Sequence, residues 1–178
     1  MSLSFGAVLI ESTVAPPEEL LQQLGLTRFR AAGQISLNDA TRSDFVDTAI
    51  GYYRQRTIVI DRLLPYDCSY QPGELSALDL RLVELSAAGL VMCFYLDGRT
   101  GSSGFTLFWD GQRIRRRAVD PVHLSIDEGE PLPAEQDFAA SSRNDETRIF
   151  ALSAVVLDEP LDTLIFMKEV ELQVYAES

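Results

Sequence analysis

The stretch "LVMCFYLDGRTGSSGFTLFWDGQRIRRRAV", Leu90–Val119, identifies the architecture most directly. Its first seven residues, Leu90–Leu96, form a continuous apolar run that is short for a helix and typical of a buried strand. After a glycine-rich turn, two further strands are predicted over Phe105–Trp109 and Gln112–Val119. The dipeptide between them, Asp110–Gly111, is a strong two-residue hairpin signal. We therefore expect a three-stranded antiparallel meander.

Two more strands and two helices are expected upstream. Phe5–Ile10 is a short apolar run, and Thr57–Asp61 is rich in β-branched residues that favour a central strand. Pro16–Leu24 begins with prolines and glutamates and is followed by a glycine, which favours a short helix. Ser76–Ala88 begins with a capping box and is expected to be helical. Its predicted apolar face consists of leucines at three- and four-residue steps: Leu75, Leu78, Leu82 and Leu85. The sequence predicts an α+β fold, in which two or three helices pack on one face of a mainly antiparallel sheet.

Two segments, residues 33–53 and 136–178, leave alternatives open. A strand is expected around Ile35, followed by either a helical turn or an irregular segment around Ser43–Ile50. Ile149–Leu157 is apolar and suits a strand or a helix equally. Pro160–Met167 is compatible with a last helix. A final strand is indicated by the alternation of Val170, Leu172 and Val174.

Length and composition predict one globular domain over residues 1–178, since 46% of the residues are hydrophobic and the length is that of a typical domain. No run of eighteen apolar residues and no secretory signal pattern is present, so no membrane association is expected. The two cysteines, Cys68 and Cys93, lie far apart in the sequence, and a reduced, buried pair is expected. These features together favour the cytoplasm.

The formal net charge of −12 is distributed unevenly. Residues 1–119 carry 13 acidic and 12 basic side chains, whereas residues 120–178 carry 14 acidic and 3 basic ones. This balance repels phosphate backbones, so nucleic acid is an unlikely partner.

Four arginines within five positions form the most unusual local pattern. Side chains alternate between the two faces of a strand, so Arg113, Arg115 and Arg117 are expected on one face and Arg116 on the other. Three cations in a row repel one another unless acids or a ligand neutralise them. The favoured explanation is internal pairing or solvation, and the next is binding of an acidic protein or a small anion.

The preceding turn, "DGRTGSSG", has a superficial similarity to a phosphate-binding loop. It lacks the lysine of such a loop and leads into a strand, so a hairpin connection is the favoured interpretation. Its backbone amides, over Gly101–Gly104, remain a candidate anion site beside Arg99. The candidate binding residues are therefore Arg99, Arg113, Arg115 and Arg117.

Catalytic and metal-binding signatures are weak throughout the chain. His123 is the only histidine, and its surroundings contain no nucleophile elbow. One histidine and two distant cysteines do not predict a zinc site, and "DEGE" at Asp127–Glu130 lacks the spacing of a calcium loop. We therefore name no catalytic residue, no metal ligand and no cofactor.

One sequence pattern in this chain is similar to a pattern in other proteins. A strand, a D-G turn, a strand with arginine and then G-E-P-L-P-x-E resembles a group of uncharacterised bacterial proteins of unknown function. The resemblance covers about Thr57 to Glu135 and implies no catalytic residues. The matching residues are Asp110, Gly111, Arg116, Gly129, Glu130, Pro131, Leu132, Pro133 and Glu135.

Two functional hypotheses remain from the sequence. The first is a non-enzymatic binding or protein-interaction domain, which a flat surface with arginines on one side and acids on the other would favour. The alternative is a small-molecule enzyme or ligand-binding domain with a carboxylate-based site. A deep pocket holding a buried carboxylate of raised pKa would favour this alternative. The oligomeric state is left open.

Overall fold

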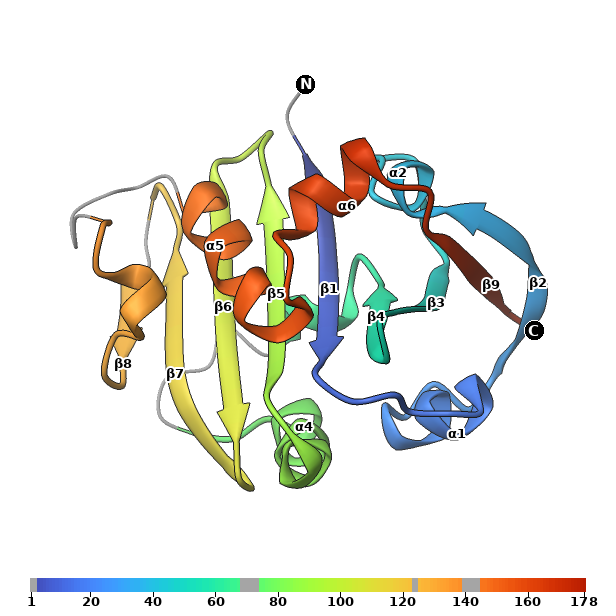
Figure 1. The fold of residues 1–178 in the computed structure, drawn as a ribbon, viewed down its shortest axis with the longest axis horizontal. Coiled ribbons are helices and arrows are strands. Elements are labelled where there is room, and N and C mark those ends of the chain that lie inside the picture. Colours follow the sequence, from blue (N-terminus) through green and yellow to red (C-terminus); the bar gives the residue numbers. More distant parts are fainter. Residues whose placement is uncertain (1–2, 68–73, 123–124, 139–144) are drawn as a thin grey trace.

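The computed structural model describes residues 3–67, 74–122, 125–138 and 145–178. These residues form one antiparallel sheet of nine strands in the order β2-β9-β3-β4-β1-β5-β6-β7-β8 (Figure 1). The strands are β1 (Ser4–Ile10), β2 (Phe29–Ser36), β3 (Thr48–Tyr53), β4 (Arg56–Ile60), β5 (Val91–Asp97), β6 (Ser102–Trp109), β7 (Gln112–Val119), β8 (Ser125–Glu128) and β9 (Glu171–Glu177). The helices are α1 (Pro17–Gln23), α2 (Leu37–Ala40), α3 (Leu64–Asp67), α4 (Ala77–Leu85), α5 (Glu146–Leu157) and α6 (Leu161–Met167), with short 3-10 helices η1 (Ser86–Ala88) and η2 (Pro133–Glu135).

The predicted α+β class and the predicted meander are both confirmed. β5 pairs with β6 and β6 with β7 in antiparallel register. The turn between β6 and β7 needs its D-G dipeptide, because Asp110 and Gly111 have φ values of 49° and 72°. Two consecutive left-handed residues form the turn that matches the twist of a hairpin, and aspartate and glycine tolerate this conformation best.

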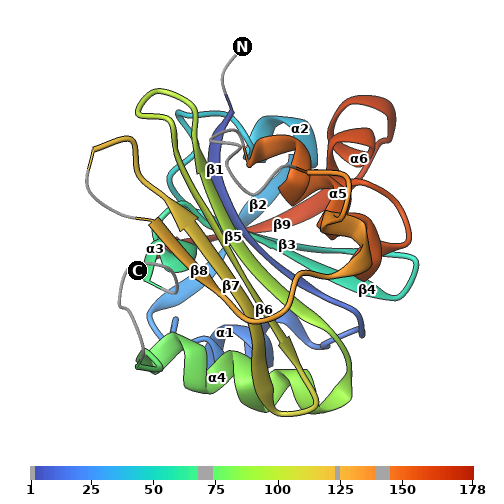
Figure 2. The same ribbon diagram turned by 90° about the vertical axis from the view of Figure 1, so that its left-hand side faces the viewer.

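Helices cover both faces of the sheet. The two helices expected from the sequence, α1 and α4, lie together on one face (Figure 2). The capping box of α4 is formed as predicted between Ser76 and Asp79. The opposite face is covered by α2, α5 and α6, which come from segments that the sequence left open (Figure 1). The ambiguous run within Ile149–Leu157 is helical.

The core accordingly has two halves separated by the sheet. Within β1, Ala7 and Leu9 pack towards α5 and α6, whereas Val8 and Ile10 pack towards α1 and α4. This strand is buried along its whole length, which explains why its sequence is a continuous apolar run without polar alternation.

Two local expectations are wrong. Residues 48–50 begin strand β3, where a helical turn or an irregular segment was expected. This strand pairs on both sides, with β4 and with β9, so its conformation is set by distant neighbours. Leu75 precedes α4 and is exposed, so it does not belong to the buried leucine face of that helix.

Candidate functional site

A β-bulge separates the arginines of β7. β6 and β7 pair residue by residue except between Leu107, which faces Arg115, and Phe108, which faces Arg113. Ile114 is the extra residue, and it packs with the core half beneath α5. A bulge interrupts the alternation of side chains, so Arg113 and Arg115 point to opposite faces. The prediction that Arg113, Arg115 and Arg117 share one face is therefore wrong.

Arg113 lies on the face covered by α4. Its guanidinium is 3.6 Å from the carboxylate of Asp79 and 3.5 Å from that of Glu128. It also donates a hydrogen bond of 3.4 Å to the carbonyl oxygen of Glu74. These contacts attach the start of α4 to the end of the sheet.

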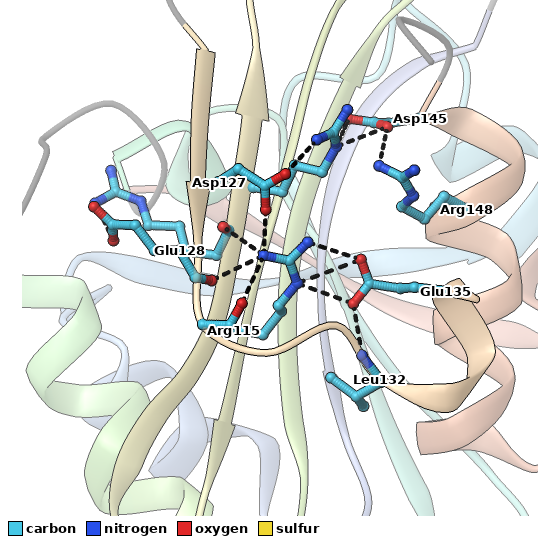
Figure 3. Close-up of polar contacts among 10 residues, drawn as sticks. Arg115, Asp127, Glu128, Leu132, Glu135, Asp145 and Arg148 are labelled. Carbon is cyan, nitrogen blue, oxygen red and sulfur yellow. Dashed lines mark hydrogen bonds and ion pairs between the residues drawn. The ribbon is translucent and has the colours of Figure 1, made fainter. Parts of the chain in front are cut away.

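Arg115 is buried on the other face, beneath η2. Its Nε and Nη2 donate to the two carboxylate oxygens of Glu135, each at 3.0 Å (Figure 3). Its Nη1 donates to Asp127 and, at 2.9 Å, to the carbonyl oxygen of Glu128. The guanidinium also lies over the ring of Phe105, with its central carbon 5.8 Å from the ring centre. Such a two-pronged pair fixes the plane of the guanidinium as well as its position.

Arg117 continues the cluster towards α5. Its Nε donates to Asp145, which directly precedes α5, at 3.0 and 3.1 Å. Arg148 donates to the same carboxylate at 2.9 Å, as Figure 3 shows. Asp127 bridges the two halves of the cluster, because it accepts from Arg115 and, at 2.8 Å, from Arg117.

The electrostatics of the cluster follow from this geometry. Burial acts to raise the pKa of Asp127, but the hydrogen bond from Arg115 and the charges of Arg115 and Arg117 outweigh burial, and the pKa lies below its usual value. Burial acts to lower the pKa of Arg115, and the hydrogen bonds from its guanidinium to Glu135 and Asp127 reverse that effect and raise the pKa. The contacts between Arg115 and Asp127 thus favour the charged forms of both groups.

Internal pairing, the favoured explanation of the arginine run, is confirmed. Except for Asp79, the acids come from the acidic last third of the chain, but the sequence did not single out Glu135 or Asp145 as partners of these arginines. Glu135 had one available signal, since it ends the G-E-P-L-P-x-E motif. Its carboxylate also accepts the backbone N–H of Leu132 at 3.0 Å. Asp145 follows residues that lie outside the described part of the chain.

Arg99 lies in the turn between β5 and β6. It lines a pocket of about 470 Å³ that we call the strand-end pocket. Four separate segments form it: the start of β1, the loop after β4, the end of β5 with the β5–β6 turn, and the residues directly after β7. Its apolar lining comes from Phe5, Leu63, Leu96, Pro121 and Val122. Its charged lining comes from Arg62, Asp97, Arg99 and Asp120.

The backbone amides near Arg99 are not available as an anion site, which corrects the sequence-based hypothesis. The N–H of Gly101 donates to the carbonyl oxygen of Asp97 at 2.8 Å, and the N–H of Ser102 donates to the hydroxyl of Thr100 at 3.3 Å. The next two residues lie within β6, which is paired on both sides. These backbone amides are therefore already hydrogen-bonded within the protein, and any bound anion would have to be held by side chains.

Both carboxylates of the strand-end pocket cap backbone turns. Asp97 accepts hydrogen bonds of 3.1 Å from the hydroxyl of Ser4 and from the backbone N–H of Arg99. Burial acts to raise the pKa of Asp97, but these hydrogen bonds, with others from Arg99 and Thr100, lower it below the usual value. Asp120 accepts the backbone N–H of Val122 at 2.8 Å.

Metal ligation finds no support in the described ranges, where no group of three or more His, Cys, Asp or Glu side chains is arranged to hold an ion. Within those same ranges, no helix is long and apolar enough to cross a membrane. Cys93 is buried and not part of a disulfide. His123 and Cys68 lie outside the described residues, so their predicted roles stay predictions.

These features define an α+β domain whose arginine-rich strand is neutralised internally and whose sheet ends in an open, mixed-polarity pocket. The chain belongs to the family of unknown function DUF6928, whose model matches residues 12–162. This match contains the whole G-E-P-L-P-x-E region, and it confirms the resemblance to a group of proteins of unknown function. A search of curated proteins found no match, and a search of solved structures found none either.

Proposed function

We propose that this protein is a binding domain that holds a small molecule in the strand-end pocket. The observation that carries the proposal is the pocket itself. Its volume of about 470 Å³ lies within the range of small-molecule sites, and apolar walls there meet a few charged groups. Strand ends from the centre of the sheet form much of its lining, so the site is built on a rigid scaffold.

Two side chains at this pocket support the same conclusion. Leu63 is 76% exposed and Val122 is 72% exposed, although both are apolar and both line the pocket. Exposed apolar side chains that line a hollow are typical of a surface that a ligand covers. Burying them on binding would be favourable, because apolar surface gains free energy when it leaves water.

Binding is favoured over acid–base catalysis by the state of Asp97, one of the two carboxylates in the pocket. A general acid that works at neutral pH needs a carboxyl group whose pKa is raised. The pKa of Asp97 is lowered instead, and its Oδ1 atom accepts hydrogen bonds from the Ser4 hydroxyl and from the backbone of the turn that it caps. The carboxylate-based enzyme is therefore the weaker of the two hypotheses.

Of the two partners expected from the sequence, the small anion fits better than the acidic protein. An acidic protein would need an exposed row of arginines, whereas Arg115 and Arg117 are buried among internal acids. Arg99 remains a candidate binding residue, since it lines the pocket and is largely exposed. We also retain the cytoplasm as the proposed compartment, which the buried free thiol of Cys93 supports.

The test is the identity of what the protein retains when it is purified from its own organism. Wild type would be compared with Thr100→Trp, which places a large ring at the pocket, and with Thr27→Trp. Thr27 is also an exposed turn threonine but is not part of the pocket lining. Each protein would be denatured, and the released compounds would be measured by mass spectrometry.

We expect a compound that is enriched with wild type and Thr27→Trp and lost from Thr100→Trp, with all three proteins showing the same circular dichroism. Equal retention by all three proteins would place binding elsewhere. No enrichment with any of them would remove the support for a small-molecule function.

A further inference from the structure

We infer that the ligand of the strand-end pocket is an organic anion, in which a carboxylate or phosphate group is bound by Arg62 and Arg99 and an apolar body lies against Leu63 and Val122. This inference rests on the proposed function, because it names the class of molecule for the same pocket. It is carried by hydrogen-bonding capacity and by the position of the apolar side chains.

Arg62 and Arg99, the two arginines of the pocket, have N–H donors that no described residue accepts. A guanidinium has five N–H donors and never gives up its proton at ordinary pH. Arg62 donates one hydrogen bond of 3.0 Å, to the carbonyl oxygen of Ser43. The side chain of Arg99 makes a single long contact of 3.4 Å, to Asp97. Most donors of both groups therefore have no acceptor among the described residues, in contrast to Arg115, which is surrounded by acceptors.

The two carboxylates of the pocket leave too few free acceptor oxygens for these arginine donors. Asp97 has its Oδ1 atom engaged by the Ser4 hydroxyl and by the backbone N–H of Arg99 in its own turn. Asp120 has one oxygen engaged by the backbone of Val122. Donors thus exceed acceptors at this pocket, in a chain whose formal net charge is −12. A ligand with strong acceptor oxygens would satisfy the guanidinium groups best, and charge-assisted pairs of this kind are the stronger hydrogen bonds.

The apolar lining of the pocket indicates that the rest of the ligand is apolar. An inorganic ion would leave the exposed side chains of Leu63 and Val122 uncovered in a pocket of about 470 Å³. An apolar body attached to the anionic group would cover them. The two parts of the ligand would therefore contribute separately, one through charge and the other through burial.

The experiment is a calorimetric titration with four probes that separate these two parts. Phenyl phosphate and benzoate each combine a ring with an anionic group, and they distinguish a phosphate from a carboxylate ligand. Inorganic phosphate supplies the charge without the ring, and benzyl alcohol supplies the ring without the charge. We expect one of the two ring-bearing anions to bind about tenfold more tightly than either single-part probe.

The variants are Arg62→Gln/Arg99→Gln and the control Arg28→Gln/Arg30→Gln. Both double variants remove two positive charges, but Arg28 and Arg30 are exposed and do not line the pocket. We expect the pocket variant to weaken binding of the favoured anion about tenfold or more and the control to leave it nearly unchanged. Raising the salt concentration should weaken binding to the wild type.

Three results would overturn the inference. Benzyl alcohol could bind as tightly as the anions, both double variants could bind the anion equally, or none of the anions could bind. If a neutral compound binds and Thr100→Trp abolishes that binding, the proposed function stands and only the anion inference fails. If neither anions nor neutral compounds bind, and nothing is retained on purification, both fail.

Discussion

Glu135 receives two hydrogen bonds of 3.0 Å from the guanidinium of Arg115, and each of these side chains is only 2% exposed. The two residues lie 20 positions apart, on η2 and β7. The pair therefore attaches the acidic segment after β8 to the sheet at a buried point. It also gives a physical role to the last residue of the G-E-P-L-P-x-E motif.

Removing one member of this pair should destabilise the protein strongly. Glu135→Ala leaves the Arg115 charge buried with part of its acceptors gone, and breaking a buried pair in this way typically costs about 3–5 kcal/mol. Arg115→Met/Glu135→Leu removes both charges and should cost less than the single variant, although Asp127 would still lose one partner. Urea unfolding measures both. Glu130→Ala, a change at an exposed neighbour, is the control, and a loss of the same size in that variant would contradict the assignment.

Acid should weaken the cluster through Asp127. Its pKa is lower in the folded protein than its usual value of 3.8, so it binds protons more readily when the chain is unfolded. Its contribution to stability is therefore complete above about pH 4 and is lost as the pH falls through the folded-state pKa.

We expect Asp127→Asn to be less stable than wild type at pH 7 and to lose less stability on acidification. The free energy of unfolding between pH 7 and pH 3 measures this difference. Asp137→Asn, which changes an exposed acid without an ion pair among the described residues, is the control. Parallel pH curves for wild type and Asp127→Asn would show that Asp127 does not stabilise the fold through its charge.

Gly129 is required by both its conformation and its surroundings. Its φ is +82°, and a Cβ atom there would overlap the carbonyl oxygen of Ile114 and approach the Cα of Arg115 to 3.1 Å. Gly111 has a similar φ of +72° but no atom within 4 Å of the corresponding position. Gly111→Ala should therefore cost about 1–2 kcal/mol, from the left-handed backbone alone.

Gly129→Ala should cost clearly more, because the alanine also displaces the backbone of the bulge that orients Arg115. Thermal unfolding of the two variants gives the comparison. Equal shifts in melting temperature would mean that the contact with Ile114 contributes nothing.

Alkaline pH should destabilise the opposite side of the molecule through Tyr175. Burial and then the charge of Glu18, which also accepts a hydrogen bond from the hydroxyl, raise the pKa of Tyr175 to about 12. The folded pKa is above the usual value of 10.0, so this contribution is complete below about pH 10 and disappears as the pH rises through about 12.

Absorbance titration of the tyrosines should show a late ionisation near pH 12 that is missing in Tyr175→Phe. The free energy of unfolding of that variant should also fall less steeply above pH 10 than that of wild type. Ionisation of every tyrosine near pH 10 in the folded protein would refute the assignment.

The sequence alone predicted those elements that are specified by residues close to one another in the chain. The meander followed from an apolar run, a D-G turn and a strand of suitable length, and α4 followed from its capping box and leucine spacing. These features depend on backbone preferences and on neighbours within a few positions. They were sufficient for the fold class and for the placement of α1 and α4 on one face.

Other features depended on contacts between distant segments. The apolar run within Ile149–Leu157 satisfied the pattern of a strand as well as that of a helix, and only the open face of the sheet made it a covering helix. The arginines of β7 changed faces because of a bulge against β6, and strand alternation within one chain segment does not contain that information. The acids that neutralise them are distant in the sequence, and Asp145, for example, lies 28 residues from Arg117. The strand-end pocket likewise exists only where four distant segments meet, because a cavity is a property of packing and not of any one stretch of chain.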